Sequence, residues 1–304
     1  CKIFDRMRQS WKFLIRANFV LASLLLSACQ DSFHEGFQEE AGGPVVVGIT
    51  AGGAQTRTEM QANGLSAEWT AGDELAVWAR NASGDLVLSN QIFKTYGIDS
   101  SRGFFTSTLS EAMPEDTYTY MCCYPAPLSV DGTKVTFNIP SVQDGKVSGG
   151  ADVMIASPVQ HGALGPVPDP EDHSGMNMTM NRMMHQFRFY IPEEDQILGE
   201  EKIERILLTF PTGVTGNVTL DLSDSSSPVE ISDAQVDAEL ELAQPIGVSS
   251  GDDYQFACFA FAPVQFAEGQ SLQIVKAYTD DKIAFFFEEA PCYADNHEKG
   301  YSMV

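Results

Sequence analysis

The chain has 304 residues, 43% of them hydrophobic and 20% charged, and its formal net charge is −24 at pH 7. This hydrophobic content is ordinary for a globular protein and excludes a chain that is disordered along its whole length. The strong negative charge repels nucleic acid and anionic lipid headgroups, so we expect neither as an electrostatic partner.

Residues 1–28 have the parts of a secretory signal peptide. Arg8, Lys12 and Arg16 make its beginning basic, residues 19–26 are apolar except for Ser23, and two small residues follow. The apolar run is far shorter than the roughly 20 residues that a membrane-spanning helix requires. We therefore predict that residues 1–28 direct export and are then removed.

The tetrapeptide Leu26-Ser27-Ala28-Cys29 resembles the bacterial lipobox. The resemblance implies that Cys29 is lipidated, with palmitate among the attached acyl chains, and becomes the first mature residue at the cell outer membrane. The alternative is a cysteine that follows an ordinary signal peptide by chance. Without the five basic residues and one acidic residue of the leader, 13 Lys+Arg stand against 41 Asp+Glu, a net charge of −28. This charge suits a soluble domain held off a surface by a tether, which we place at residues 29–43.

Short segments in which apolar and polar residues alternate recur along the chain. Alternation with a period of two is typical of a strand with one buried face. Residues 252–263 are apolar at both alternating sets of positions, as in a central strand, and the one helical candidate, 193–205, is weakened by Gly199. The pattern predicts an all-β chain of two β-sandwiches. The clearest alternating segments are 134–139, 185–191, 217–222 and 234–242.

A stretch rich in Pro, Gly and acidic residues interrupts the alternation at 166–182 and has the composition of a linker. We predict an N-terminal β-sandwich domain over 44–165 and a C-terminal β-sandwich domain over 183–304. The sequence stops where a new strand pattern begins, so we expect the C-terminal domain to be truncated and its last strand to be missing.

Four cysteines follow the leader: Cys122, Cys123, Cys258 and Cys292. In an oxidising compartment they could pair in three ways. Cys122 and Cys123 are adjacent, so on a strand they point to opposite faces and are not expected to bond to each other. We favour the alternative that these cysteines are small buried apolar residues, since no Cys-x-x-Cys or Cys/His ligand spacing is present.

No motif of the sequence indicates catalysis. There is no nucleophile with a local base, no metalloprotease motif and no phosphate-binding loop. His185 is in phase with Phe187, which favours a strand residue over a catalytic base. We predict no catalytic residue, no metal and no cofactor, and therefore no enzyme.

Two groups of residues leave a binding role open. A polar cluster could hold a cation, although such runs are more often solvated loops. Four aromatic residues could stack on sugars if exposed, although strand aromatics are more often core residues. The polar cluster is His161, Asp169, Glu171, Asp172 and His173, and the aromatic residues are Trp69, Trp78, Tyr118 and Tyr120.

Five short motifs occur in order along the chain: Thr56-Arg57, Trp69 with Gly72-Asp73, Tyr120 with Tyr124-Pro125, Asp152 with Met154 and Ala156, and His185. With these motifs in this order, the chain resembles the fimbrillin-like family of Bacteroidetes, a group of type V pilus subunits and adhesins, over most of residues 29–304. The resemblance implies two transthyretin-like, Greek-key β-sandwiches in tandem and a fimbrial structural subunit or accessory adhesin of the cell surface.

The resemblance also implies that a trypsin-like maturation protease cuts between Arg57 and Thr58. The cut would release the lipidated segment together with the first strand, 44–51, and a strand of another fimbrial subunit would fill the groove that remains. An ordinary loop arginine is the alternative for Arg57. For the whole protein, the alternatives are a lipid-anchored glycan-binding protein that does not polymerise and, more distantly, an exported hydrolase. An adhesin would take a glycan or protein on host or bacterial surfaces as its target.

Overall fold

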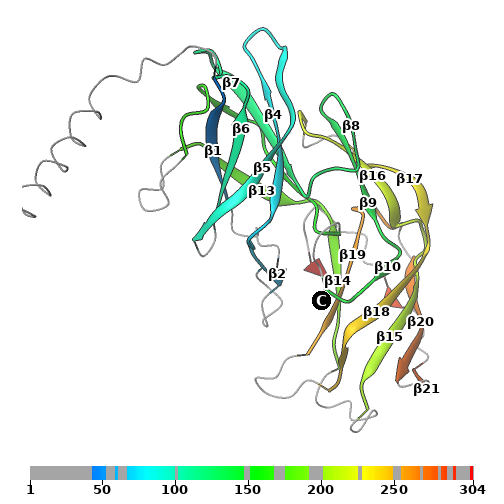
Figure 1. Cartoon of the computed structure of the whole chain (residues 1–304). Coiled ribbons are helices and arrows are strands. Elements are labelled where there is room, and N and C mark those ends of the chain that lie inside the picture. Colours follow the sequence, from blue (N-terminus) through cyan, green and yellow to red (C-terminus); the bar gives the residue numbers. More distant parts are fainter. Residues whose placement is uncertain are drawn as a thin grey trace, which may run out of the picture. The chain divides into compact units, whose positions relative to one another are not determined.

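The alternating segments form strands in the computed structural model, and none of the residues that it describes lies in an α-helix (Figure 1). The prediction of an all-β chain is confirmed. Across the described ranges, no helix is long and apolar enough to cross a membrane. The described residues are 43–52, 59–60, 67–99, 102–146, 151–167, 175–191, 201–224, 228–248, 255–267, 270–279, 282–285, 290–291 and 302–303.

Seven strands form a sheet that closes on itself, which we call the closed sheet (Figure 1). Their order is β11-β13-β1-β6-β5-β4-β7, and pairing of β7 with β11 completes the ring. A further strand, β12, pairs with the part of β7 that β11 does not reach. The bounds are β1 (Val45–Gly52), β4 (Glu74–Arg80), β5 (Leu86–Asp99), β6 (Arg102–Leu109), β7 (Tyr118–Tyr124), β11 (Met154–Ala156), β12 (Val159–His161) and β13 (Asn177–Arg182).

Inward side chains of the closed sheet form a first core, which includes Val47, Phe93, Phe105, Tyr120 and Met178. All five are fully buried, as the alternation of their strands requires. Successive side chains of a strand point to opposite faces of the sheet, so each strand contributes every second side chain to this core.

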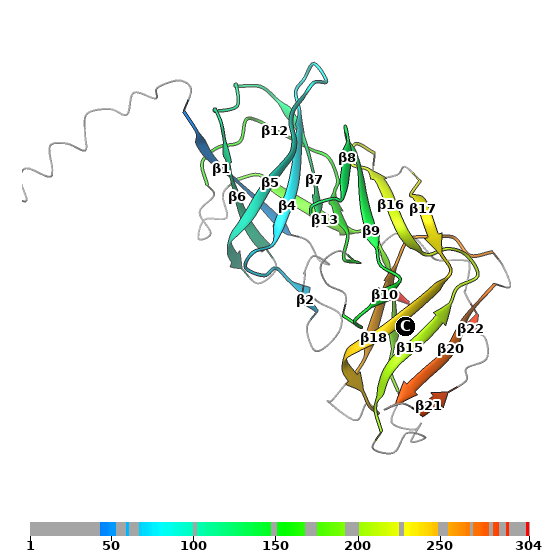
Figure 2. The same ribbon diagram turned by 45° about the vertical axis from the view of Figure 1, so that its right-hand side comes forward.

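A second core, the shared core, lies between β4 and β7 of the closed sheet and a four-stranded sheet (Figure 2). The outward Trp78 and Met121 pack there with Phe137, Val218 and Leu220. The order of this sheet is β17-β16-β9-β8, with bounds β8 (Ser129–Asp131), β9 (Lys134–Ile139), β16 (Thr215–Asp221) and β17 (Glu230–Gln235). The turn at Asp131-Gly132 joins β8 to β9, and Gly132 has φ = 62°.

The outer strand β17 carries a bulge. The register with β16 shifts between Thr215 and Asn217, where Gly216 has φ = 126° and Asp233 has φ = 54°. A Cβ on Gly216 would lie 2.7 Å from the carbonyl oxygen of Ser232, so only glycine fits this position.

A third core lies between two sheets of the second half and includes Leu208, Phe210, Leu240, Phe259 and Phe261. One sheet has the order β10-β18-β15-β20-β21, with β22 also paired to β20, and the other has the order β19-β14-β23. A separate hairpin pairs β2 (Glu59–Met60) with β3 (Ala67–Glu68). The remaining bounds are β10 (Val142–Gln143), β14 (His185–Phe189), β15 (Ile203–Thr209), β18 (Asp237–Ile246), β19 (Ala257–Phe261), β20 (Ser271–Thr279), β21 (Lys282–Phe285), β22 (Ala290–Pro291) and β23 (Ser302–Met303).

Strand pairing crosses the predicted division of the chain in both directions. Strands β9 and β10 pair with β16 and β18 of the second half, while β13, which lies within the predicted linker 166–182, pairs with β1 and β11 of the first. Residues Pro44–Val304 group into one compact unit. The two-domain boundaries and the transthyretin-like arrangement stay predictions, and the first half is a closed sheet where two open layers were expected.

Candidate functional site

Strand β1 occupies a slot between β6 and β13, which we call the seat of β1. It runs antiparallel to β6 along its whole length, from Val45 opposite Leu109 to Gly52 opposite Arg102. On its other side its last three residues run parallel to β13, with Thr50 opposite Asn177. The predicted strand at 44–51 is confirmed, and both of its edges are bonded within the closed sheet.

The side chains of β1 are part of the first core. Val47, Ile49 and Ala51 point inward and have no exposed surface. Thr50, on the other face, is also buried, and its Oγ1 contacts the carbonyl oxygen of Met176 at 3.2 Å and Oδ1 of Asn177 at 3.0 Å. Full burial of a Val or Ile side chain stabilises a fold by about 1.5–3 kcal/mol, so β1 contributes substantially to this core.

Three residues of the sequence motifs meet beside the seat of β1. The ring of Trp69 lies edge-on to Phe105, with centroids 5.1 Å apart, and to Tyr124 at 5.4 Å. Phe105 is the register partner of Ile49 on β1. The Tyr124 hydroxyl donates to Oδ1 of Asp73 at 3.1 Å. Motif residues that are far apart in the sequence therefore contact one another at the first core.

The Gly-Asp motif forms the turn that leads into β4. The backbone N–H of Thr70 donates to Oδ2 of Asp73 at 2.6 Å, and the N–H of Asp73 donates to the Thr70 carbonyl. Gly72 has φ = 97°, a conformation that side-chain-bearing residues rarely adopt. This turn fixes the Asp73 carboxylate where Tyr124 reaches it.

A buried ion pair ties β13 to the segment that precedes β11. Nε of Arg182 lies 2.6 Å from Oδ1 of Asp152, and Nη2 lies 3.0 Å from Oδ2. Asp152 has no exposed surface. Burial raises the pKa of the Asp152 carboxyl above its ordinary value, an effect that the Arg182 guanidinium opposes. Asp152 was singled out by its motif, whereas Arg182 lay within the predicted linker and was missed.

The predicted lipidation and processing residues, Cys29, Arg57 and Thr58, lie outside the described residues, as does Cys292. The other predicted cysteines, Cys122, Cys123 and Cys258, are free and buried. Burial raises the pKa of Cys122 to about 12 and that of Cys258 to about 11. Cys122 faces the first core and Cys123 the shared core, which confirms that these neighbours point to opposite faces.

The four aromatic residues considered for sugar binding are core residues. Trp69, Trp78, Tyr118 and Tyr120 are all buried, so they offer no surface on which a sugar ring could stack. His185 is also buried, with its ring edge-on to Phe261 at 5.4 Å, as expected for a strand residue.

Of the five residues of the predicted cation cluster, His161 is described and exposed, and the other four lie outside the described residues. In the part of the chain that the structure describes, no group of three His, Cys, Asp or Glu side chains is arranged to hold a metal ion.

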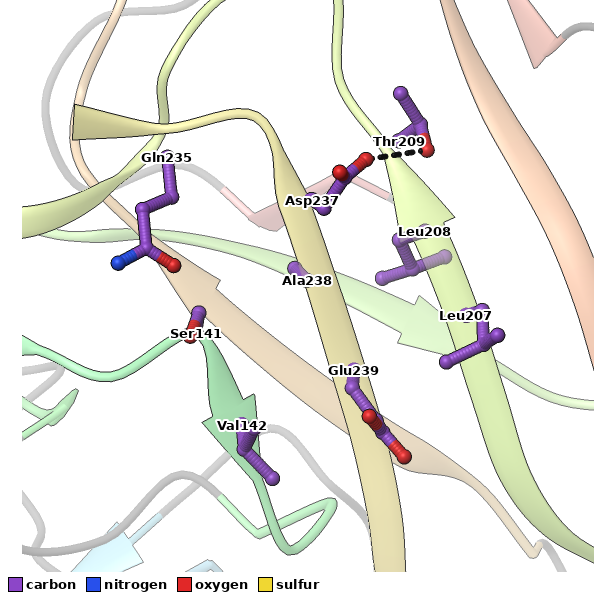
Figure 3. Close-up of a pocket in the computed structure, with 9 residues that line it drawn as sticks. All are labelled: Ser141, Val142, Leu207, Leu208, Thr209, Gln235, Asp237, Ala238 and Glu239. Carbon is purple, nitrogen blue, oxygen red and sulfur yellow. Dashed lines mark hydrogen bonds between the residues drawn. The ribbon is translucent and has the colours of Figure 1, made fainter.

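A groove of ≈ 440 Å³ lies over β15 and β18 beside β10 (Figure 3). Val142 and Leu207 give it aliphatic surface, and Thr209 Oγ1 donates to Oδ1 of Asp237 at 2.8 Å. Glu239, also in the lining, is ion-paired with Arg205. Its lining residues are Ser141, Val142, Leu207, Leu208, Thr209, Gln235, Asp237, Ala238 and Glu239, none of them aromatic, so the groove lacks the stacking surface of a sugar site.

Solved structures similar to this chain are known. No protein-family model matches the sequence, and no curated protein matches it. The chain is similar to a "putative cell adhesion protein" from Bacteroides uniformis, with 14% identity over 79% of this chain and 88% of that chain and a TM-score of 0.48.

Two further solved structures are similar to the chain. A fimbrial assembly protein from Parabacteroides distasonis has 10% identity over 86% of this chain and 89% of that chain, with a TM-score of 0.40. The fimbrial anchor protein Mfa2 from Porphyromonas gingivalis has 12% identity over 75% of this chain and 76% of that chain, with a TM-score of 0.31.

Proposed function

We propose that the protein is a fimbrial structural subunit or accessory adhesin of the bacterial cell surface, exported as a lipoprotein anchored through Cys29 at the outer membrane. A trypsin-like protease cuts after Arg57, and a strand of a neighbouring subunit then takes the place of β1. The observation that carries this proposal is the seat of β1, in which a strand next to the chain's N-terminal segment is bonded on both edges and buried on its inward face.

Loss of β1 would expose two kinds of surface at once. The backbone groups of β6 and β13 that now bond to β1 would lose their partners, and the first core would lose Val47, Ile49 and Ala51. An extended strand from another molecule recovers both the ladder hydrogen bonds and the apolar burial. Because the donor strand and the seat are different parts of the subunit, the contact is heterologous and grows a fibre.

The substitution Arg57→Ala tests the cut. The variant is expected to fold like the native protein but to give no SDS-resistant ladder, because β1 remains attached. N-terminal sequencing of the native protein after limited trypsin digestion should read from Thr58.

Lys146→Ala, which removes an exposed basic residue elsewhere, is the matched control and should form the same ladder as the native protein. Ladders of equal length for Arg57→Ala and the native protein would contradict the proposal.

A further inference from the structure

The β13 side of the seat of β1 is lined by methionine. Met176, Met178 and Met180 point into the first core, and none is more than 3% exposed. The residues between them, 177, 179 and 181, are exposed. Met178 is the register partner of Ala51, so the two side chains lie next to each other in the core that β1 fills.

Methionine differs in stiffness from the residues that it contacts here. Its unbranched side chain has three rotatable bonds and a polarisable sulfur, so it fills gaps of variable shape and is common on surfaces that bind several partners. The β6 side of the seat is different, since it places Phe105 opposite Ile49 and Leu109 opposite Val45. The seat thus has one stiff side and one adaptable side.

The C-terminal end of β13 has contacts that do not involve β1. The ion pair of Arg182 with Asp152 anchors its last residue, and the N–H of Met183 donates to the Val153 carbonyl at 2.8 Å. Met183 and Met184 are buried in the shared core, on the opposite side of the closed sheet from the first core. These contacts, together with the pairing of β11 to residues 180–182, hold the chain just beyond the three residues of β13 that pair with β1, while the methionine side chains can change rotamer.

We infer that the seat of β1 accepts extended strands whose inward aliphatic side chains differ in size from Val47, Ile49 and Ala51, so that strands of more than one kind of subunit can fill it. The occupant is an extended aliphatic segment of another subunit, since an extended aliphatic strand, β1, is what the seat now holds. This inference rests on the proposed function, but its test uses the intact, uncut chain.

The test enlarges one fully buried alanine on β1 and a matched alanine on β4. Ala51→Val should lower the melting temperature by less than about 2 °C, because Met178 can move aside. Ala79→Val should lower it by about 4–8 °C or prevent folding, because Ala79 lies in the same core between Tyr120 and Leu88. If Ala51→Val lowers the melting temperature as much as Ala79→Val does, or if the Ala51→Val variant does not fold, the inference is overturned.

Repeating the Ala51→Val substitution in a Met178→Ile variant tests whether Met178 is the reason that the larger side chain is tolerated. In Met178→Ile, which keeps an apolar side chain of similar size but stiffens it, the shift caused by Ala51→Val should grow to the size seen at Ala79. An unchanged small shift would show that methionine is not responsible and would also overturn the inference. Failure of the Arg57 experiment would remove the proposed function without altering these melting temperatures, so the two failures can be told apart.

Discussion

At the scale of single residues, the ion pair of Asp152 and Arg182 is the most unusual feature of the closed sheet. A carboxylate without exposed surface is tolerated because the guanidinium binds it through two parallel hydrogen bonds. Replacing a whole buried pair by apolar residues is often neutral, but removing one partner leaves the other buried and uncompensated. The pair therefore fixes the position of β13 more than it adds net stability.

Asp152→Asn is expected to lower the free energy of unfolding by about 3 kcal/mol, because Arg182 then lacks its counter-charge in a largely buried site. The midpoint of urea unfolding measures the loss. Glu74→Gln makes the same chemical change in the exposed Glu74–Lys94 pair, whose side chains are 39% and 70% exposed, and should cost less than about 1 kcal/mol. Equal losses for the two variants would show that Asp152–Arg182 behaves as a surface pair.

At the scale of elements, the strand β19 has one edge bonded by β14 and the other bonded by a side chain. Nε2 of Gln143 donates to the Ala260 carbonyl at 2.7 Å, and the Ala260 N–H donates to Oε1 of Gln143 at 2.9 Å. The amide of Gln143 thus makes the two hydrogen bonds that a neighbouring strand would make. This contact also joins β10, from the first half of the sequence, to β19 in the second half.

Gln143→Met keeps the length of the side chain but leaves the N–H and C=O of Ala260 without these partners in a buried place. We expect a loss of about 2–3 kcal/mol in the free energy of unfolding, measured as a lower urea midpoint at unchanged slope. The exposed Gln160 on β12 provides the control, because Gln160→Met removes no such bonds and should change the midpoint little. A small effect of Gln143→Met would mean that water satisfies Ala260.

The strands could be predicted from the sequence far better than their partners could. Alternation of apolar and polar residues predicts which side chains are buried, and in the alternating segments of β9, β16 and β18 the buried side chains are apolar. It does not say which strand lies alongside, so the pairing of β9 with β16 across the predicted boundary was not foreseen. Residues 257–261 were expected in the middle of a sheet because both faces are apolar, but β19 lies at the end of its sheet between two apolar layers.

The candidate site was predicted in part for the same reason. The motifs singled out Trp69, Asp73 and Tyr124, but only the fold shows that they touch. Arg182 and the methionines of β13 were hidden in a stretch that reads as a linker, because its Pro, Gly and acidic residues outweighed the Met-x-Met-x-Met alternation. Long-range contacts, which bring Arg182 to Asp152, leave no local pattern.

At the scale of the whole molecule, the shared core joins strands from both halves of the sequence. Trp78 and Met121 come from the closed sheet, whereas Val218 and Leu220 come from β16, which pairs with β9. Neither half can bury these side chains without the other. The described part of the chain should therefore unfold as one cooperative unit.

Hydrogen exchange in increasing urea, read by mass spectrometry, tests this expectation. Peptides covering β4 and β7 should lose protection at the same urea concentration as peptides covering β15 and β19. Leu220→Ala, a buried truncation that should cost about 2–5 kcal/mol, is expected to move all four midpoints down together. A lower midpoint for β15 and β19 alone would show that the halves unfold separately.

The bulge on β17 has a consequence for how fibres would lie beside one another. An exposed outer strand is a template for sideways pairing, and a bulge together with charged side chains prevents it. β17 has the bulge at Asp233 and also carries Glu230, on a chain of strong negative charge. If the protein assembles as proposed, its filaments should repel one another and pair poorly along this edge, so that growth stays end to end and the filaments remain single instead of bundling.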